Sequence, residues 1–345
     1  MASGWTLGGI RQSGRHPAEL PLARAAVELW ARLRDIVGVG VEYRRGGNLR
    51  LARSAAEVDV IRRMVDEHRE RGLDLAFLPD NASIREIAPA ISRDVLAASL
   101  CLTDGHANPM MATMAFADDA RRNGARVVVG VAARALKVNA GRVAGVVTDD
   151  ETFDADCVIV AAGVNTPALV APLGVELPLA LKIVHVVLSD PIAPTLAQVF
   201  GVANADCAGR QQADGRLRYT SGAEGWDGDP AAWTEAALAP TDRDVRRVVE
   251  RVAQVVPIAG TTPVAKSWGG LIDLTPDALP VIDAPLPGLV VAAGFSGHGF
   301  CLGPVSGQLC ADLALGCAAR HEISAFRLDR FCKRTGGNAQ LSLHG

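Results

Sequence analysis

The segment LVVAAGFSGHGF, residues 289–300, joins a short apolar run to a glycine loop, and the rest of the chain is best interpreted from it. The run at 289–293 predicts a buried strand, and the residues after the loop predict a helix that starts near Pro304. Glycines at a strand-to-helix turn let the backbone approach a flat or anionic ligand, and the helix N-terminus adds N–H donors and a positive dipole. The same spacing fits a tight turn without a ligand, so both interpretations stay open here.

Two further segments have the composition of a ligand site. VIVAAG, residues 158–163, ends an apolar run in small residues, which lets a ligand lie against the backbone at the end of a strand. WGGLIDLTPDALP, residues 268–280, contains the turn signal Thr275-Pro276-Asp277. Taken singly, each segment is equally well explained by packing or by turn formation.

Hydrophobic periodicity orders the remaining elements. It predicts helices over 19–36, 55–71 and 242–256, with shorter ones near 84–87, after Pro109 and near 325–332. It predicts strands on both sides of Gly46-Gly47, a fully buried strand at Val127–Val131, and antiparallel strands at 181–189 and 216–221. Because βα units surround an antiparallel middle, we expect a mixed α/β fold. A Rossmann-like nucleotide layer would be assembled from discontinuous segments and would carry an inserted antiparallel sheet.

Composition excludes several classes of function. The chain has 345 residues and a formal net charge of -3, so no basic surface for nucleic acid is expected. It contains no apolar run long enough to span a bilayer, and its first residues lack the pattern of a secretory signal. Its seven cysteines form no C-x-x-C pair and no cluster with zinc spacing, so we expect no metal site. Scattered thiols are typical of a reducing compartment, here the cytoplasm.

Six motifs occur in the order and approximate spacing of one known family: SGWTLGGIRQ at 3–12, DGHANP at 104–109, VIVAAG, WGGLIDLTPDALPVI at 268–282, GFSGHGF at 294–300 and FRLDRF at 326–331. Together they resemble the D-amino-acid oxidase family of FAD-dependent oxidoreductases, which includes glycine and sarcosine oxidases and the flavin subunits of D-hydroxyproline and opine dehydrogenases. DGHANP and the LPLA of the first helix look most like such flavin subunits.

The resemblance implies an enzyme that oxidises the C–N bond of a small amino or imino acid by hydride transfer to flavin. A second subunit of a heteromeric dehydrogenase would be its possible partner. It also implies an FAD-binding domain from 1–40, 105–180 and 281–345, and a substrate domain from 41–104 and 181–280. Some relatives attach flavin through a cysteine that is absent from 268–275, so we expect non-covalent FAD. Cys301 stands where some amine oxidases of the family carry a lysine.

The resemblance also assigns roles to individual residues. The flavin would be lined by Ser3, Gly8, Gly9 and Ile10. Val131 and Ala132 would lie near the adenine half, and Ala162 and Gly163 near the dinucleotide. The pyrimidine side would be held by Gly294, Gly297, His298, Gly299 and Phe300.

Two catalytic candidates follow, Arg11 and His298. A guanidinium at Arg11 suits a substrate carboxylate, although a salt bridge that holds the loop explains it equally well. For His298 we favour a role in shaping the loop over proton transfer. Trp268 is a candidate wall of the substrate cavity, with core packing as the alternative.

One family feature is not found in the sequence. The strand–GxGxxG–helix unit that binds the pyrophosphate is absent, and GVGVEY at 38–43 lacks the third glycine. We considered a misassigned start, a unit supplied by a separate chain, and a decayed relative that no longer binds FAD, and we favour the first. The functional alternative is a truncated, non-catalytic scaffold or subunit that needs a partner chain.

Overall fold

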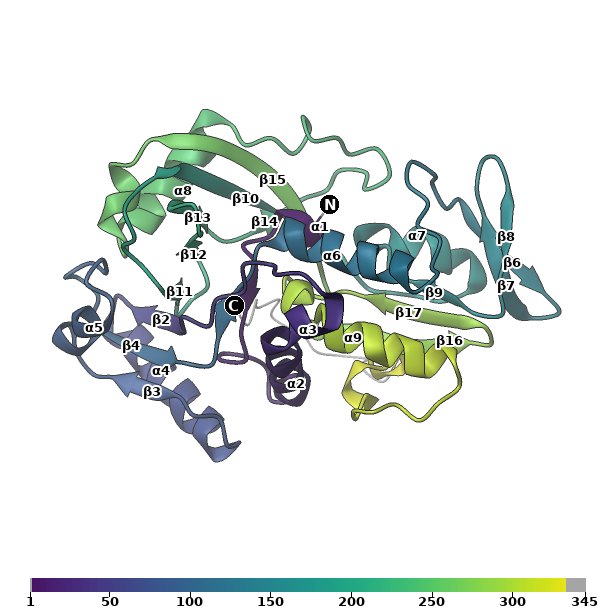
Figure 1. The fold of residues 1–345 in the computed structure, drawn as a ribbon, viewed down its shortest axis with the longest axis horizontal. Helices are drawn as coiled ribbons and strands as arrows, with labels where there is room; N and C mark the ends of the chain where they lie inside the picture. Colours follow the sequence, from purple (N-terminus) through teal and green to yellow (C-terminus); the bar gives the residue numbers. More distant parts are fainter. Residues whose placement is uncertain (1, 333–345) are drawn as a thin grey trace.

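The computed structural model describes residues 2–332. Figure 1 shows a large curved sheet at one end, a small three-stranded sheet from residues 135–154 at the other, and helices α2, α6 and α9 between them. The helices are α1 Ala2–Trp5, α2 Leu20–Ala31, α3 Leu33–Val37, α4 Ala55–Glu70, α5 Asn81–Ile87, α6 Pro109–Arg122, α7 Thr166–Val170, α8 Asp242–Ala253 and α9 Gly299–Ala314. The helices predicted over 19–36, 55–71 and 242–256 are thereby confirmed, the first of them as the pair α2 and α3.

The large sheet combines strands from two distant parts of the chain. Its order is β14 (Glu224–Gly225), β10 (Ala180–Pro191), β13 (Arg216–Thr220), β12 (Ala208–Gln211), β11 (Val199–Val202), β2 (Asn48–Ala52), β4 (Ala97–Cys101) and β3 (Ala76–Leu78), and β15 (Val264–Leu274) also pairs with β10. The predicted antiparallel pair is confirmed, because Val187 of β10 lies opposite Tyr219 of β13. Within the described part of this sheet, β11 and β2 form the one parallel pair.

Helix α8 is defined by its cap and by its amphipathic sequence. Thr241 and Asp244 form a capping box in which each side chain bonds the other's backbone N–H. Val248 and Val252 then face the buried side chains of Phe200 and Tyr219. These contacts give the large sheet its own core.

A three-stranded sheet contains the apolar run at residues 289–293 as its central strand. Its order is β16 (Val281–Leu286), β17 (Leu289–Ala293) and β9 (Val158–Val160), with β17 and β9 parallel. Every residue of β17 is buried, as predicted. A separate three-stranded sheet is made by β6 (Ala135–Asn139), β7 (Arg142–Val147) and β8 (Thr152–Asp154).

Helix α9 begins earlier than predicted. It starts at Gly299 rather than near Pro304, which lies inside the helix. The backbone N–H of His298 bonds the carbonyl of Phe295 at 2.7 Å, so the glycine loop closes on itself and the helix follows directly. The predicted helix near 325–332 is two short 3-10 turns, Ser324–Phe326 and Leu328–Phe331.

Two strand predictions are wrong. The residues directly before Gly46 form no strand, so Gly46 and Gly47 do not make a hairpin turn. A Cβ at Gly46 would lie 2.1 Å from the carbonyl oxygen of Ala197, so this glycine allows two backbone segments to approach closely. Residues 127–131 form no strand either, and Val129 is 82% exposed. An apolar run becomes a strand only where another strand accepts its backbone hydrogen bonds, and no strand in residues 2–332 pairs with it.

Adjacent glycines of β15 provide a test of this packing. A Cβ at Gly269 would lie 1.9 Å from the backbone carbonyl of Leu238, whereas a Cβ at Gly270 meets no heavy atom within 4 Å. We expect Gly269→Ala to destabilise the protein by about 2 kcal/mol through overpacking, and Gly270→Ala to leave stability within about 0.5 kcal/mol. Denaturant unfolding of both variants measures this; equal effects would contradict the contact.

Candidate functional site

Residues 3–13, called the opening stretch below, are held by a short ladder of backbone hydrogen bonds. β1 (Gly9–Ile10) pairs with β5 (Gly105–His106) in antiparallel register. The fully buried carboxylate of Asp104 accepts the backbone N–H groups of Gln12 at 2.9 Å and Ser13 at 3.2 Å, and also the Ser13 hydroxyl. The motifs SGWTLGGIRQ and DGHANP are therefore one structural unit.

The glycine loop has the backbone that its sequence predicts. Gly294 and Gly297 have φ of +66° and +84°, which L side chains rarely adopt. Asp273, at the end of β15, anchors the loop through its carboxylate, which accepts the Gly294 N–H at 2.8 Å, and through its carbonyl, which accepts the Ser296 N–H. The first N–H groups of α9 have no partner within the helix and supply donors and positive potential beside this loop.

His298 lies at the start of α9 in a buried polar network. Its Nδ1 is 3.0 Å from a carboxylate oxygen of Glu19, and Glu19 also lies beside Arg15. Burial lowers the pKa of His298 to about 4. Burial also acts to raise the pKa of Glu19, but its contacts with His298 and Arg15 outweigh that effect and lower this pKa to about 2. Neutral His298 thus donates its Nδ1–H to ionised Glu19, and its buried Nε2 has no hydrogen-bond partner.

Arg11 belongs to the opening stretch and directly follows β1. Its guanidinium donates to the carbonyl of Ser13, and its own carbonyl accepts from the thiol of Cys301 and from Arg15. Burial, followed by the charges of Arg15 and Arg50, lowers the pKa of Arg11 well below its ordinary value. The structure thus brings Arg11 to the start of α9.

The other residues predicted to bind the cofactor do not all lie near the start of α9. Ala162 and Gly163 follow β9 at the start of a 3-10 turn, Gly163–Asn165, and a Cβ at Gly163 would meet nothing within 4 Å. Val131 and Ala132 are exposed and lie outside any strand. In contrast, Gly8, Gly9 and Ile10 pack near the start of α9, and a Cβ at Gly9 also meets nothing within 4 Å.

Two arginines that the sequence analysis did not identify face the opening stretch from the large sheet. Arg210 of β12 and Arg218 of β13 are direct cross-strand partners. Arg210 donates to the carbonyls of Leu7 and Ala107, and Arg218 donates to the carbonyl of Trp5 at 2.8 Å. The predicted wall residue Trp268 donates to the same carbonyl of Trp5 and carries the Arg218 guanidinium 4.8 Å above its ring centroid.

Neither of these arginines has a carboxylate partner among the residues that the structure describes. Burial, followed by the charge of Arg218, lowers the pKa of Arg210 to about 9, and burial lowers that of Arg218 to about 10. Nε of Arg218 is buried without a hydrogen-bond partner. Arg210 is buried and Arg218 is half-buried. Cations withdrawn from water without counterions are costly, so this pair has the character of an anion-binding site.

Comparison with known proteins identifies the class. A family model described as FAD dependent oxidoreductase, the DAO family, matches residues 1–313. The D-amino acid dehydrogenase of Cereibacter sphaeroides is 30% identical over 320 residues, which cover 90% of this chain and 70% of that protein. The sarcosine oxidase subunit beta of Rhizobium meliloti is 25% identical, covering 97% and 81%.

The solved structures agree. The L-proline dehydrogenase from P. horikoshii superimposes with a TM-score of 0.86 at 25% identity, covering 95% of this chain and 87% of that one. The chain belongs to the DAO family of FAD-dependent oxidoreductases, which confirms both the resemblance and the mixed α/β fold class.

The residues present fit an FAD cofactor. His298 Nε2 is a buried acceptor without a partner, and Gly9 and Gly163 leave open space where a side chain would stand. The start of α9 offers N–H donors where a reduced flavin would carry negative charge. Within residues 2–332 no helix has the length and apolar character to cross a membrane, and no group of three or more metal-ligating side chains is found.

The buried histidines predict a dependence of stability on pH. The pKa of His298 falls from 6.5 to about 4 and that of His106 to about 3, mainly through burial. Their contribution to stability is therefore complete above pH 6.5 and is lost as the pH falls below it, because the unfolded chain takes up protons first. Between pH 6 and 5 we expect each to lower the free energy of unfolding by about 1.4 kcal/mol.

His298→Gln should remove one of these contributions. Denaturant unfolding at pH 7, 6 and 5 would then give a shallower pH dependence for the variant than for the parent protein. The same slope in both would show that His298 titrates alike in the folded and unfolded chains.

Proposed function

We propose that this chain oxidises the C–N bond of a small amino or imino acid, using non-covalently bound FAD. The observation that carries the proposal is the pair Arg210 and Arg218, one buried and one half-buried guanidinium without carboxylate partners in the described residues, beside Trp268 and the opening stretch. A substrate carboxylate would supply the missing negative charge through charge-assisted hydrogen bonds. The relatives named D-amino acid dehydrogenase and sarcosine oxidase subunit beta support this substrate class.

The chain's own residues would position the reactants. Gly8, Gly9, Ile10 and the loop from Gly294 to Phe300 would hold the ring system, with Ser3, Ala162 and Gly163 nearby and Val131 and Ala132 assigned to the adenine half. When bound, FAD supplies the two-electron acceptor that the oxidation requires. Trp268, and Trp5 with Trp233 against it at 6.4 Å between ring centroids, would shield the substrate from water.

Arg218 is the proposed carboxylate anchor, and Arg11 is the competing candidate from the sequence. Arg218 has an unpartnered buried Nε, whereas Arg11 lies among other charged groups near α9. His298 would act as a positioning residue, because its Nδ1 proton is committed to Glu19. These roles distinguish carboxylate binding from shaping of the cofactor loop.

Domain division, partner and location complete the proposal. Residues 1–40, 105–180 and 281–345 would form the FAD-binding domain, of which residues 1 and 333–345 lie outside the described part of the chain. Residues 41–104 with 181–280 would form the substrate domain, whose strands share the large sheet. A second subunit is proposed because one relative is named as a beta subunit. We propose the cytoplasm as the compartment on the basis of the scattered, unpaired cysteines.

Substitution of Arg218 tests the proposal. In the flavin-loaded protein, Arg218→Met should lower kcat/KM for the amino acid roughly 100-fold, mostly through KM, because a charged hydrogen-bond partner is lost. The matched control is Arg216→Met, two residues earlier on β13, whose guanidinium already lies near Asp190 and Asp214. Anaerobic reduction of the flavin absorbance by amino acids measures the effect.

Two outcomes would overturn the proposal. A purified protein that takes up no FAD would favour the non-catalytic scaffold. A large loss in Arg11→Met with no loss in Arg218→Met would move the carboxylate site to Arg11. Partial recovery of the cavity variant Arg218→Ala by added guanidinium ion would separate carboxylate binding from a folding defect.

A further inference from the structure

A cavity of about 310 Å³ is lined by Arg15 and Arg50. The rest of its lining comes from the loop at 14–17, from α4 and from Ala203. Arg15 and Arg50 are only 4% and 5% exposed. Exposed Arg63 and Glu67 belong to the wall from α4, so the cavity is reached from the surface.

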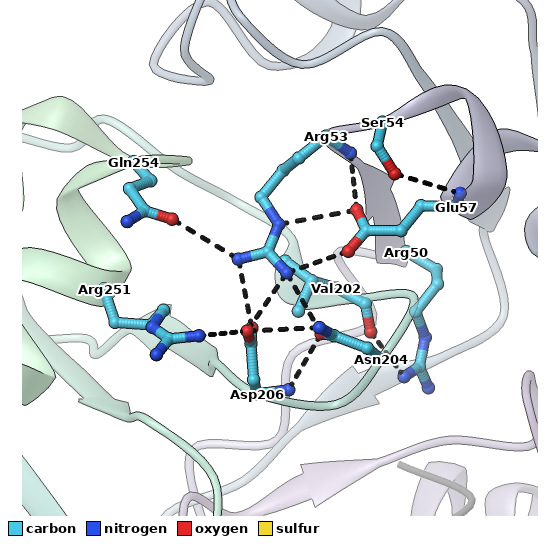
Figure 2. A network of polar contacts seen from close by, with 9 residues as sticks. All are labelled: Arg50, Arg53, Ser54, Glu57, Val202, Asn204, Asp206, Arg251 and Gln254. Carbon is cyan, nitrogen blue, oxygen red and sulfur yellow. Dashed lines mark hydrogen bonds and ion pairs between the residues drawn. The ribbon is translucent and has the colours of Figure 1, made fainter.

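Arg50 lacks the counterion that its neighbour has. Figure 2 shows the contrast: Arg53 contacts the carboxylates of Glu57 at 2.9 Å and Asp206 at 3.1 Å, whereas Arg50 donates only to the carbonyl of Val202, at 3.2 Å. No ion pair of Arg50 occurs in the described part of the chain. Burial and the charge of Arg15 lower the pKa of Arg50 to about 10.

The surrounding charges do not balance. Three cations, Arg11, Arg15 and Arg50, face two carboxylates, Glu19 and Asp104. The exposed Arg63 and Glu67 of the cavity wall add one charge of each sign and leave this difference unchanged. Asp104 is occupied by the backbone of Gln12 and Ser13, and Glu19 is shared between Arg15 and His298. Nη1 of Arg15 is buried without a hydrogen-bond partner. One positive charge is thus left for a ligand.

We propose that this cavity binds a small oxyanion, a phosphate or a carboxylate, between Arg15 and Arg50. The planar fork of a guanidinium matches two oxygens of such an anion. The site is distinct from the Arg210–Arg218 pair, which faces the opening stretch from the large sheet. Its ligand is therefore a second molecule and not the substrate of the proposed oxidation.

Thermal unfolding of the FAD-loaded protein tests the site, because bound FAD already fills the cofactor's own phosphate contacts. Titration with inorganic phosphate should raise the Tm progressively, as binding to the folded state requires, and calorimetric titration should give one site per chain. Sodium acetate and sodium chloride at equal ionic strength form the comparison arms. Preference for phosphate or for acetate over chloride identifies the anion; equal shifts in all three arms would overturn the proposal.

Variants locate the ligand. Arg50→Met should weaken anion binding at least tenfold while leaving the anion-free Tm unchanged or higher, because an uncompensated buried charge is removed. Arg50→Lys should bind less tightly than the parent, since the ammonium lacks the fork. Arg53→Met is the control: it should lower the anion-free Tm and keep the affinity. Unchanged anion affinity in Arg50→Met would refute the site. The result does not depend on the rate of flavin reduction by amino acids.

Discussion

The fold around the site depends on Asp104. Its buried carboxylate takes three hydrogen bonds from Gln12 and Ser13, and so joins the opening stretch to the segment between β4 and α6. Burial raises the pKa of this carboxyl group, and the hydrogen bonds from Ser13 and Gln12 oppose that rise. These bonds reinforce the β1–β5 ladder, which pairs at two positions, and help to hold Gly8–Arg11 between the large sheet and α9.

Buried and half-buried arginines contact this anchored stretch from two sides. Arg210 and Arg218 reach it from the large sheet, and Arg15 and Arg50 lie next to Arg11 and Gly14. Proteins seldom bury charge without compensation, because desolvation costs several kcal/mol per ion. Backbone carbonyls and two carboxylates provide part of that compensation here. The uncompensated charge is the basis of both proposed anion sites, one for the substrate and one for a separate oxyanion.

Local sequence patterns predicted the elements that depend on local rules. The strand at 289–293, the helix over 55–70 and the positive-φ glycines of the loop follow from periodicity and from the freedom of glycine. The predictions at 127–131 and around Gly46 failed, because a strand needs a partner and a glycine pair can serve a close contact instead of a turn. The start of α9 was misplaced because Pro304 resembles a first-turn proline but lies inside the helix.

By itself, the sequence determined the family, through six ordered motifs, and the types of the main elements. Tertiary structure alone decided which side chains share a site. Arg218 lies in RLRYT, whose alternation is that of an ordinary half-exposed strand, and its place beside Trp5 and Trp268 is set by contacts with distant parts of the chain. Arg50 likewise differs from Arg53 in its partners: Arg53 contacts Glu57 and Asp206, whereas Arg50 donates to the carbonyl of Val202. Most of these partners are distant in the chain, and no local pattern records them.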